Sequence, residues 1–214
     1  MKKRKKEHAY WGSKARNYDA ATACVIGKDT QQETEEWLTN QFKESDDVLE
    51  LGCGTGQFSE VIAEKVRHLT ATDGALEMLD RVREKLSSLR NVTVQMEDCY
   101  HTSFGDRRFD GIFLGNLIHI VREPLSVLKE GFRVLKPGGS IVLVDATSYA
   151  MAFWPKLAMG IRYLKKFGLP PKENRIVSPN DLSRWLETAG AWVEESRLIQ
   201  KETNVVCVRG RRQR

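Results

Sequence analysis

A short apolar segment that leads into three closely spaced glycines is the feature that most limits the possible folds of this chain. Asp47–Leu51 (DVLEL) is predicted to be a strand, and Gly52, Gly54 and Gly56 follow it before a helical pattern begins near Gln57. Glycine lacks a side chain, so such a loop can turn tightly and lie close to a ligand. This order favours an open parallel sheet, in which ligands bind at the carboxyl ends of the strands.

Strands and helices alternate along the rest of the chain. Further strands are predicted at 68–72, 91–96, 109–114 and 140–145, with helices at 57–66, 76–86 and 124–135. Lys136–Gly139 (KPGG) is predicted to end a helix and form a turn. Ser178 and Gly190 are predicted to cap a late helix, which two strands at 192–200 and 203–209 follow as a hairpin. The pattern predicts a doubly wound α/β fold with a seven-stranded, mostly parallel sheet ending in an antiparallel hairpin.

The domain organisation is predicted from changes in composition. Residues 1–8 form a basic segment that is expected to be disordered, and 9–210 are expected to form one domain. Within it, 9–43 are an N-terminal helical cap, 46–146 the ligand-binding core, and 151–175 a helical insertion. No segment has the length and composition of a linker to a second domain.

Charge and cysteines limit the compartment and the partners. Lys2 to Lys6 with Arg209, Arg211, Arg212 and Arg214 carry nine positive charges, so the rest of the chain has a net charge of −4 against +5 overall. A nucleic-acid-binding face usually needs a basic stripe on the fold itself, so nucleic acid is a disfavoured partner. Cys24, Cys53, Cys99 and Cys207 lack zinc-like spacing, which predicts free thiols and no metal. With no signal peptide or membrane span, the chain is expected in the cytoplasm.

The glycine cluster resembles the first motif of class I S-adenosylmethionine-dependent methyltransferases, an acidic residue followed by glycines at alternate positions. Gln57 stands where a dinucleotide-binding loop has its third glycine, which disfavours NAD. The resemblance implies a Rossmann-like fold with S-adenosylmethionine as the cofactor. It places Glu50 near the methionyl amino group and the loop of Gly52, Cys53, Gly54 and Gly56 beneath the ribose and methionine.

Other stretches of the same resemblance supply the rest of the cofactor site. Asp73 ends a strand, where its carboxylate can accept from both ribose hydroxyls. The resemblance puts Gly74 in the adjoining loop, Met78 against adenine, and Asp98 with Cys99 at the adenine amino group. Asn116 and Leu117 follow the fourth strand, and 134–145 (VLKPGGSIVLVD) resembles the family's fifth-strand stretch. Tyr10 to Asp19 is similar to the family's entry helix, in which Tyr18 covers the cofactor.

The acceptor site is less clearly marked, because the cofactor is already activated and the protein mainly aligns the acceptor and excludes water. His119 is the best candidate for a general base, and His101 is a weaker one. Asp145 and Tyr149 flank the end of the fifth strand, where acceptor contacts are common. The segment 151–168 carries an apolar stripe that includes Trp154, predicted to cover the acceptor.

The sequence leaves several alternatives open. The leading hypothesis is methyl transfer to a small, apolar acceptor such as those of quinone-biosynthesis methyltransferases, which the chain resembles. The alternative is an RNA- or protein-directed methyltransferase anchored by its basic termini. A basic amphipathic helix at 151–168 also suits a membrane surface, so surface association is a third partner hypothesis. The methylated element and the oligomeric state are not determined by the sequence.

Overall fold

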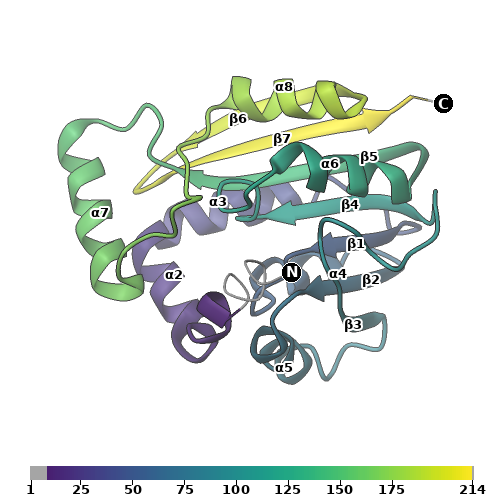
Figure 1. The fold of residues 1–214 in the computed structure, drawn as a ribbon, viewed down its shortest axis with the longest axis horizontal. Helices are drawn as coiled ribbons and strands as arrows, with labels where there is room; N and C mark the ends of the chain where they lie inside the picture. The colour runs from purple at the N-terminus through teal and green to yellow at the C-terminus, as the bar shows by residue number, and fades with distance from the viewer. Residues whose placement is uncertain (1–8, 214) are drawn as a thin grey trace.

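A twisted sheet of seven strands forms the centre of the computed structural model, which describes residues 9–213. The strand order is β3-β2-β1-β4-β5-β7-β6 (Figure 1). Strands β1 to β5 pair in parallel, whereas β7 pairs antiparallel with both β5 and β6. This arrangement confirms the predicted fold class. The strands are β1 (Asp47–Leu51), β2 (His68–Asp73), β3 (Val92–Met96), β4 (Phe109–Gly115), β5 (Leu135–Thr147), β6 (Ala191–Gln200) and β7 (Asn204–Arg212).

Helices cover both faces of the sheet because side chains in each central strand alternate between two apolar clusters. In β1, Val48 packs in the cluster of Phe58, whereas Leu49 and Leu51 pack with Leu128 on the opposite face. All three strand side chains are fully buried. The first face is covered by α3 (Lys28–Leu38), α4 (Gln57–Ala63) and α5 (Leu76–Lys85), and the second by α6 (Pro124–Val134) and α8 (Pro179–Ala189).

Two further helices lie beyond the carboxyl ends of the parallel strands. They are α2 (Tyr18–Ile26), which follows the short turn η1 (Ala15–Asn17), and α7 (Phe153–Phe167). These two helices pack against each other through Ala21, Val25 and Phe167 (Figure 1). The predicted N-terminal cap and the predicted helical insertion therefore meet beyond the carboxyl ends of the parallel strands. The predicted basic segment of residues 1–8 lies outside the described residues.

Two local sequence signals are confirmed, and one is wrong. Ser178 and Asp181 form a reciprocal capping box at the start of α8, and Gly190 ends the helix with a left-handed φ of 106°. The predicted turn at Lys136–Gly139 instead lies within β5. Leu135 is fully buried and pairs with Phe109, so the chain enters the sheet directly after α6, and the extra residues form an irregularity before Ser140.

Three of the arginines that supply positive charge near the carboxyl end are part of a strand. Strand β7 runs three residues beyond the predicted 209 and includes Arg209, Arg211 and Arg212. The first two form ion pairs with Glu194. Arg212 donates to the carbonyls of Phe132 and Leu135 at 2.6 Å. These charges are therefore part of the folded sheet, on a strand that is paired on both sides. Among residues 9–213, no helix is long and apolar enough to cross a membrane.

Candidate active site

The loop between β1 and α4 is a cradle from which side chains are excluded. Gly52, Gly54 and Gly56 have positive φ values of 73°, 55° and 82°. A Cβ on Gly52 would lie 2.8 Å from the side chain of Leu117. Positive φ strains residues that carry a Cβ, so the spacing of the three glycines is required by the backbone path of this loop.

Asp73 joins that loop to the next strand. Its carboxylate accepts from the Gly54 N–H at 3.0 Å and from the Ala75 N–H at 2.8 Å. The first contact fixes the glycine loop against the end of β2, and the second shapes the turn into α5. Asp73 also lines the adjoining cavity, so the carboxylate that positions the loop faces the space beside it.

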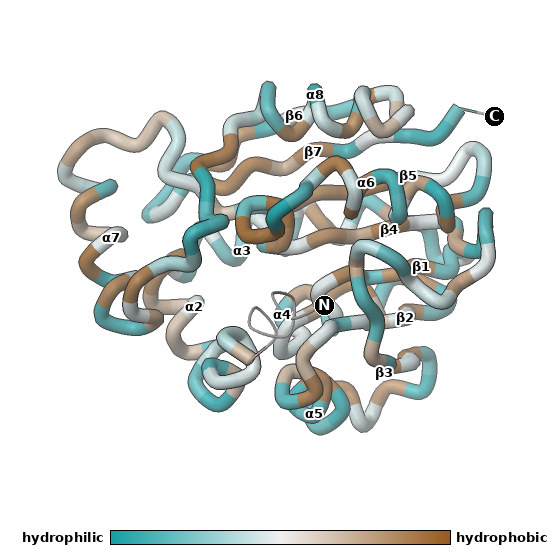
Figure 2. Tube along the Cα trace, in the orientation of Figure 1, coloured by the Kyte–Doolittle hydropathy of each residue, from teal (hydrophilic) through white to brown (hydrophobic). Residues whose placement is uncertain are grey.

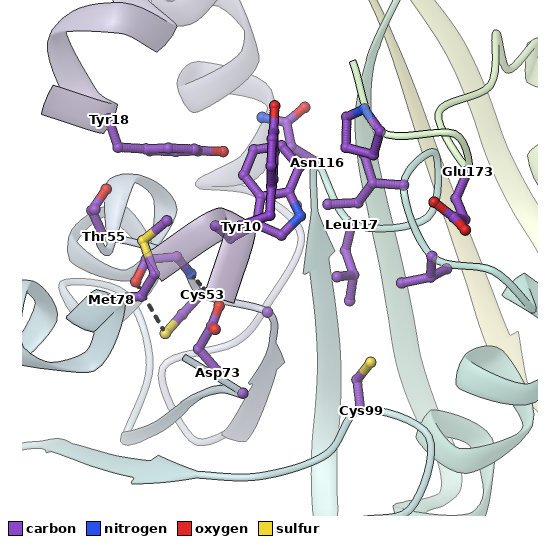
Figure 3. Close-up of a pocket in the computed structure, with 18 of the residues that line it drawn as sticks. Tyr10, Tyr18, Cys53, Thr55, Asp73, Met78, Cys99, Asn116, Leu117 and Glu173 are labelled. Atoms are coloured by element: carbon purple, nitrogen blue, oxygen red, sulfur yellow. Dashed lines mark hydrogen bonds between the residues drawn. The ribbon is translucent and has the colours of Figure 1, made fainter. Parts of the chain in front are cut away.

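A cavity of about 560 Å³ lies over the carboxyl ends of the parallel strands, a size usual for a small-molecule site. In Figure 3, Tyr18, Met78 and Asp73 lie on one side of this space, with Leu117, Cys99 and Glu173 on the other. The structure brings ten of the sequence-predicted cofactor residues to its wall: Tyr18, Gly52, Cys53, Gly54, Asp73, Gly74, Met78, Cys99, Asn116 and Leu117. A backbone cradle, a carboxylate at the end of β2 and an apolar wall suit the ribose and base of a nucleoside cofactor.

Three other predicted cofactor residues are not part of this wall. Glu50 is 1% exposed and accepts from the Ser59 hydroxyl at 2.5 Å, because the alternation in β1 turns it towards α4. Gly56 is the N-cap of α4 and does not line the cavity. Asp98 accepts from the Tyr100 N–H at 3.0 Å, and its neighbour Glu97 lines the cavity instead. Their predicted cofactor contacts remain hypotheses.

Burial has a further effect on Glu50. Desolvation among apolar side chains raises the pKa of its carboxyl group to about 7, with the nearby Asp73 charge adding to the increase. The hydrogen bond from Ser59 opposes the shift only in part. Glu50 is therefore a titratable group directly beneath the glycine loop.

Aromatic rings from the N-terminal cap close the outer side of the cavity. Tyr18 packs edge-on against Trp11 at 6.2 Å and against Phe167 of α7 at 5.7 Å. The Tyr10 hydroxyl lies 3.3 Å from the Leu169 carbonyl, to which it donates. Burial raises the pKa of Tyr18 to about 12, so its hydroxyl stays neutral at physiological pH. These contacts join the cap to α7.

Asp19 attaches the same cap to the glycine loop. Its carboxylate accepts from the Thr55 hydroxyl and from the Lys85 ammonium, the latter at 2.7 Å. Thr55 lies between two of the loop glycines and lines the cavity. The first turn of α2 is thus tied both to the loop and to α5.

A second cavity of about 190 Å³ adjoins the first and shares Trp11, Tyr18 and Asn116 with it. Side chains of α2 and α7 form an apolar wall, made of Val25, Ile26, Met159, Tyr163 and Phe167. His119, Arg175, Thr147 and Thr203 bring polar groups to the same space. The second cavity is therefore apolar on the side of the helices and polar on the side of the sheet.

The turn that delivers His119 depends on Asn116. This residue has a positive φ of 52°, a conformation that its short polar side chain tolerates. Its N–H donates to the Val144 carbonyl at 2.7 Å, and its Oδ1 accepts from the Ala146 N–H at 2.9 Å. Both bonds fix the end of β4 to β5, so His119 is held beside the end of β5.

His119 and Asp145 form a hydrogen-bonded pair, with 2.5 Å between Nδ1 and Oδ1. Asp145 is fully buried, and its Oδ2 has no hydrogen-bond partner within residues 9–213. The pair fixes the Nδ1–H tautomer, which leaves Nε2 as the basic nitrogen. The backbone N–H of Arg175 donates to the His119 carbonyl at 3.0 Å and supports the same position.

The structure does not bring the other acceptor candidates into the cavities. Tyr149 is 42% exposed and Trp154 74% exposed, and neither lines either space. Helix α7 turns Met159, Tyr163 and Phe167 inwards, so its stripe with Trp154 faces outwards. His101 is exposed, and its backbone forms an isolated β-bridge with Asp98.

Several cavity residues were not identified from the sequence. The inward residues of α7 recur at helical spacing, but that helix has apolar residues on both sides, so periodicity could not select one. Asp145 was noted only as a flanking residue, and its pairing with His119 depends on the β4–β5 register.

Comparison with known proteins agrees with this geometry. Residues 49–143 match a family described as "Methyltransferase domain". A demethylmenaquinone methyltransferase of Listeria welshimeri is 27% identical over 161 residues, 72% of this chain and 68% of the relative. A malonyl-[acyl-carrier protein] O-methyltransferase of Marinomonas is 33% identical over 122 residues, 56% of this chain and 45% of the relative. The crystal structure of a SAM-dependent methyltransferase from Aquifex aeolicus shares the fold, with a TM-score of 0.69, 23% identity and coverage of 94% and 97%.

Proposed function

We propose that this chain, which belongs to the class I S-adenosylmethionine-dependent methyltransferases, methylates a small acceptor that has an apolar body and a titratable proton. The cofactor is S-adenosylmethionine, for which the 560 Å³ cavity is the site. When bound, it supplies a methyl group on a positively charged sulfur that is already activated for displacement. The residues of the chain therefore have to bind, orient, exclude water and accept a proton.

The cofactor site is assigned to the glycine loop and to the ends of the neighbouring strands. Asp73 is positioned to accept from ribose hydroxyls while its contact with Gly54 keeps the loop in place. Met78 and Leu117 supply apolar surfaces on opposite sides of the space (Figure 3). Tyr18 and Trp11 exclude water from the outer side, where the two cavities meet.

The acceptor is proposed to occupy the smaller cavity, with its reacting atom towards His119. Nε2 of His119 takes the proton that the acceptor loses, and Asp145 stabilises the imidazolium through Nδ1. The single observation that carries this proposal is the hydrogen-bonded pair, whose histidine lines a cavity opposite an apolar wall of helix side chains. A histidine held ready to take a proton favours an acceptor that loses a proton during methylation over one that only has to be aligned with the cofactor.

Aromatic and aliphatic walls favour a ring-containing or otherwise apolar body over a charged macromolecular segment. Two relatives are named for demethylmenaquinone and malonyl-[acyl-carrier protein], which supports a small-molecule acceptor. The alternative of an RNA- or protein-directed enzyme has less support, because the space beside His119 is small and largely apolar. A cytoplasmic location remains part of the proposal.

Substitution of the pair tests this function. Turnover is measured as S-adenosylhomocysteine release with a panel of phenols and hydroxynaphthoquinones, and cofactor affinity is measured by calorimetry. We expect His119→Ala to lower kcat by about 10²–10⁴ while the cofactor dissociation constant changes less than about twofold. Asp145→Asn should lower kcat by roughly 10²–10⁴, because the tautomer of His119 is no longer fixed.

His101→Ala is the matched control, since that histidine is exposed and lies outside both cavities. Its kcat should equal that of the unaltered protein. Unchanged turnover in His119→Ala, with a control that behaves in the same way, would remove the general base from the mechanism.

A further inference from the structure

Helix α7 carries an outward apolar surface that no other described part of the chain covers. Phe153, Trp154, Leu157, Ile161 and Leu164 are between 44% and 74% exposed. They recur every three or four residues and therefore form one stripe along the helix. We call these five residues the α7 stripe.

The α7 stripe is not an unfilled part of the core. The core side of the helix is the opposite one, where Met159, Tyr163 and Phe167 pack with α2. In Figure 1, α7 lies at the left edge of the molecule with α2 between it and the sheet. Figure 2 shows apolar residues along this helix interrupted by hydrophilic ones. The helix is thus held by one side only.

The charge around the stripe has one sign. The helix contains Lys156, Arg162, Lys165 and Lys166 and no acidic residue. Arg162 is directed inwards and donates to the Val25 carbonyl at 3.2 Å. The three lysines are exposed, and none of them forms an ion pair within residues 9–213. A bulky apolar stripe beside uncompensated ammonium groups is the chemistry of a surface that binds both lipid chains and anionic headgroups.

We propose that α7 docks on an anionic lipid surface, with the α7 stripe at the headgroup boundary and the lysines at the lipid phosphates. Phe153 and Trp154, whose rings pack edge to face at 5.1 Å, suit the interface between water and acyl chains. The basic residues Lys2 to Lys6 precede Tyr10 in the sequence, and the Tyr10 hydroxyl donates to the Phe167 carbonyl at the end of α7.

The positive charge of α7 also argues against a second copy of this chain as the partner that covers the α7 stripe. A second copy of this chain in a two-fold dimer would bring α7 against an identical helix, and the lysines would face lysines. An anionic surface neutralises them instead. The inner side of α7 lines the smaller cavity, so docking places that cavity next to the lipid boundary. The docking itself does not depend on which acceptor the enzyme uses.

Vesicle co-sedimentation of the full chain tests the proposal. We expect binding to vesicles of phosphatidylcholine with phosphatidylglycerol, weakening with added salt, and little binding to phosphatidylcholine alone. Leu157→Glu with Ile161→Glu should abolish the binding. Lys165→Ala with Lys166→Ala should weaken it on the order of tenfold. Trp192→Ala is the control, because this tryptophan is equally exposed but lies on β6, and its variant should bind normally.

Each variant is checked for its fold by cofactor binding, which the α7 stripe does not touch. Three outcomes would overturn the proposal. The first is the absence of vesicle binding by the unaltered chain. The second is binding that survives Leu157→Glu with Ile161→Glu and is lost on deletion of residues 2–6, which assigns it to the N-terminal segment. The third is self-association in light scattering that the glutamate variant relieves, without vesicle binding, which assigns the stripe to contacts between copies.

Discussion

Two partly buried polar residues, Asp73 at the end of β2 and Asn116 just after β4, combine two roles that are usually separate. Asp73 uses both carboxylate oxygens to hold the backbone of Gly54 and Ala75, and it also lines the cavity proposed for the cofactor. Asn116 similarly forms hydrogen bonds to β5 through its main-chain N–H and its side-chain oxygen, and it also lines both cavities. Because each residue is fixed by the scaffold, the site is organised before any ligand binds, which lowers the entropy cost of binding.

The raised pKa of Glu50 should make the free energy of unfolding depend on pH. Its folded-state pKa of about 7 lies above its ordinary value of 4.5, so the folded state binds more protons than the unfolded state between these two pH values. The stabilisation that comes from protonated Glu50 is therefore complete below about pH 4.5 and lost as the pH rises to about 7. Glu50→Gln removes this term, with a difference of about 3 kcal/mol between the limits.

Denaturant unfolding at pH 5 and pH 8 checks this prediction. The free-energy difference between Glu50→Gln and the unaltered chain should favour the variant more strongly at pH 8. Glu60→Gln, on the exposed side of α4, is the control and should shift the two values equally. A difference for Glu50→Gln that does not change with pH would mean that this carboxyl group titrates normally.

At the scale of elements, α2 acts as a clamp between the glycine loop and α7. Asp19 supplies its inner attachment through Thr55 and Lys85, and Tyr18 supplies the outer one through Phe167. Exposed ion pairs stabilise folded proteins weakly, but this one is joined to a hydrogen bond within the cavity wall. We therefore expect these contacts mainly to keep the glycine loop in a single conformation, and to add little to the free energy of unfolding.

Loss of the clamp should be visible in cofactor affinity. We expect Asp19→Ala to raise the dissociation constant of S-adenosylmethionine about three- to tenfold, because the loop and cap must then be ordered on binding. Calorimetry measures this directly, and Asp29→Ala at the exposed start of α3 is the control. An unaltered affinity in Asp19→Ala would show that the cap is held well enough by its aromatic contacts.

For the whole molecule, the cofactor is expected to be a large part of the stability in use. A ligand present at 100 times its dissociation constant stabilises the folded state by about 2.7 kcal/mol. For a protein of this size, that corresponds to a rise in Tm of roughly 5–10 °C. We expect a micromolar dissociation constant for S-adenosylmethionine, so thermal unfolding should show this rise in Tm at a concentration about 100 times that value. NAD at the same concentration should leave Tm unchanged.

Gly54→Val is the matched variant for this measurement. Gly54 has a φ of 55°, so a β-branched side chain strains the loop and fills the space above it. The shift with S-adenosylmethionine should disappear in the variant. If NAD raised Tm as strongly as S-adenosylmethionine, the glycine loop would be serving a dinucleotide instead.

The sequence by itself determined the features that depend on local backbone chemistry. The glycines at 52, 54 and 56, the carboxylate ending β2 and the capping box at Ser178 each act over a few residues, so their patterns could be read directly. Alternation of apolar strands with amphipathic helices likewise predicted the doubly wound sheet and its closing hairpin. The position of the proposed cofactor site follows from these elements, because the carboxyl ends of the parallel strands lie together on one side of the sheet.

Only the tertiary structure decided the partners that are distant in sequence. His119 meets Asp145 because β4 and β5 pair in one register, which no local pattern specifies. Helix α7 is apolar on two sides, and contact with α2 alone determined that Phe167 faces the cavity while Trp154 faces outwards. Arg212 belongs to the sheet because carbonyls at the end of α6 and the start of β5 accept from it. A one-dimensional period fixes spacing along an element, whereas the side that is buried depends on what packs against it.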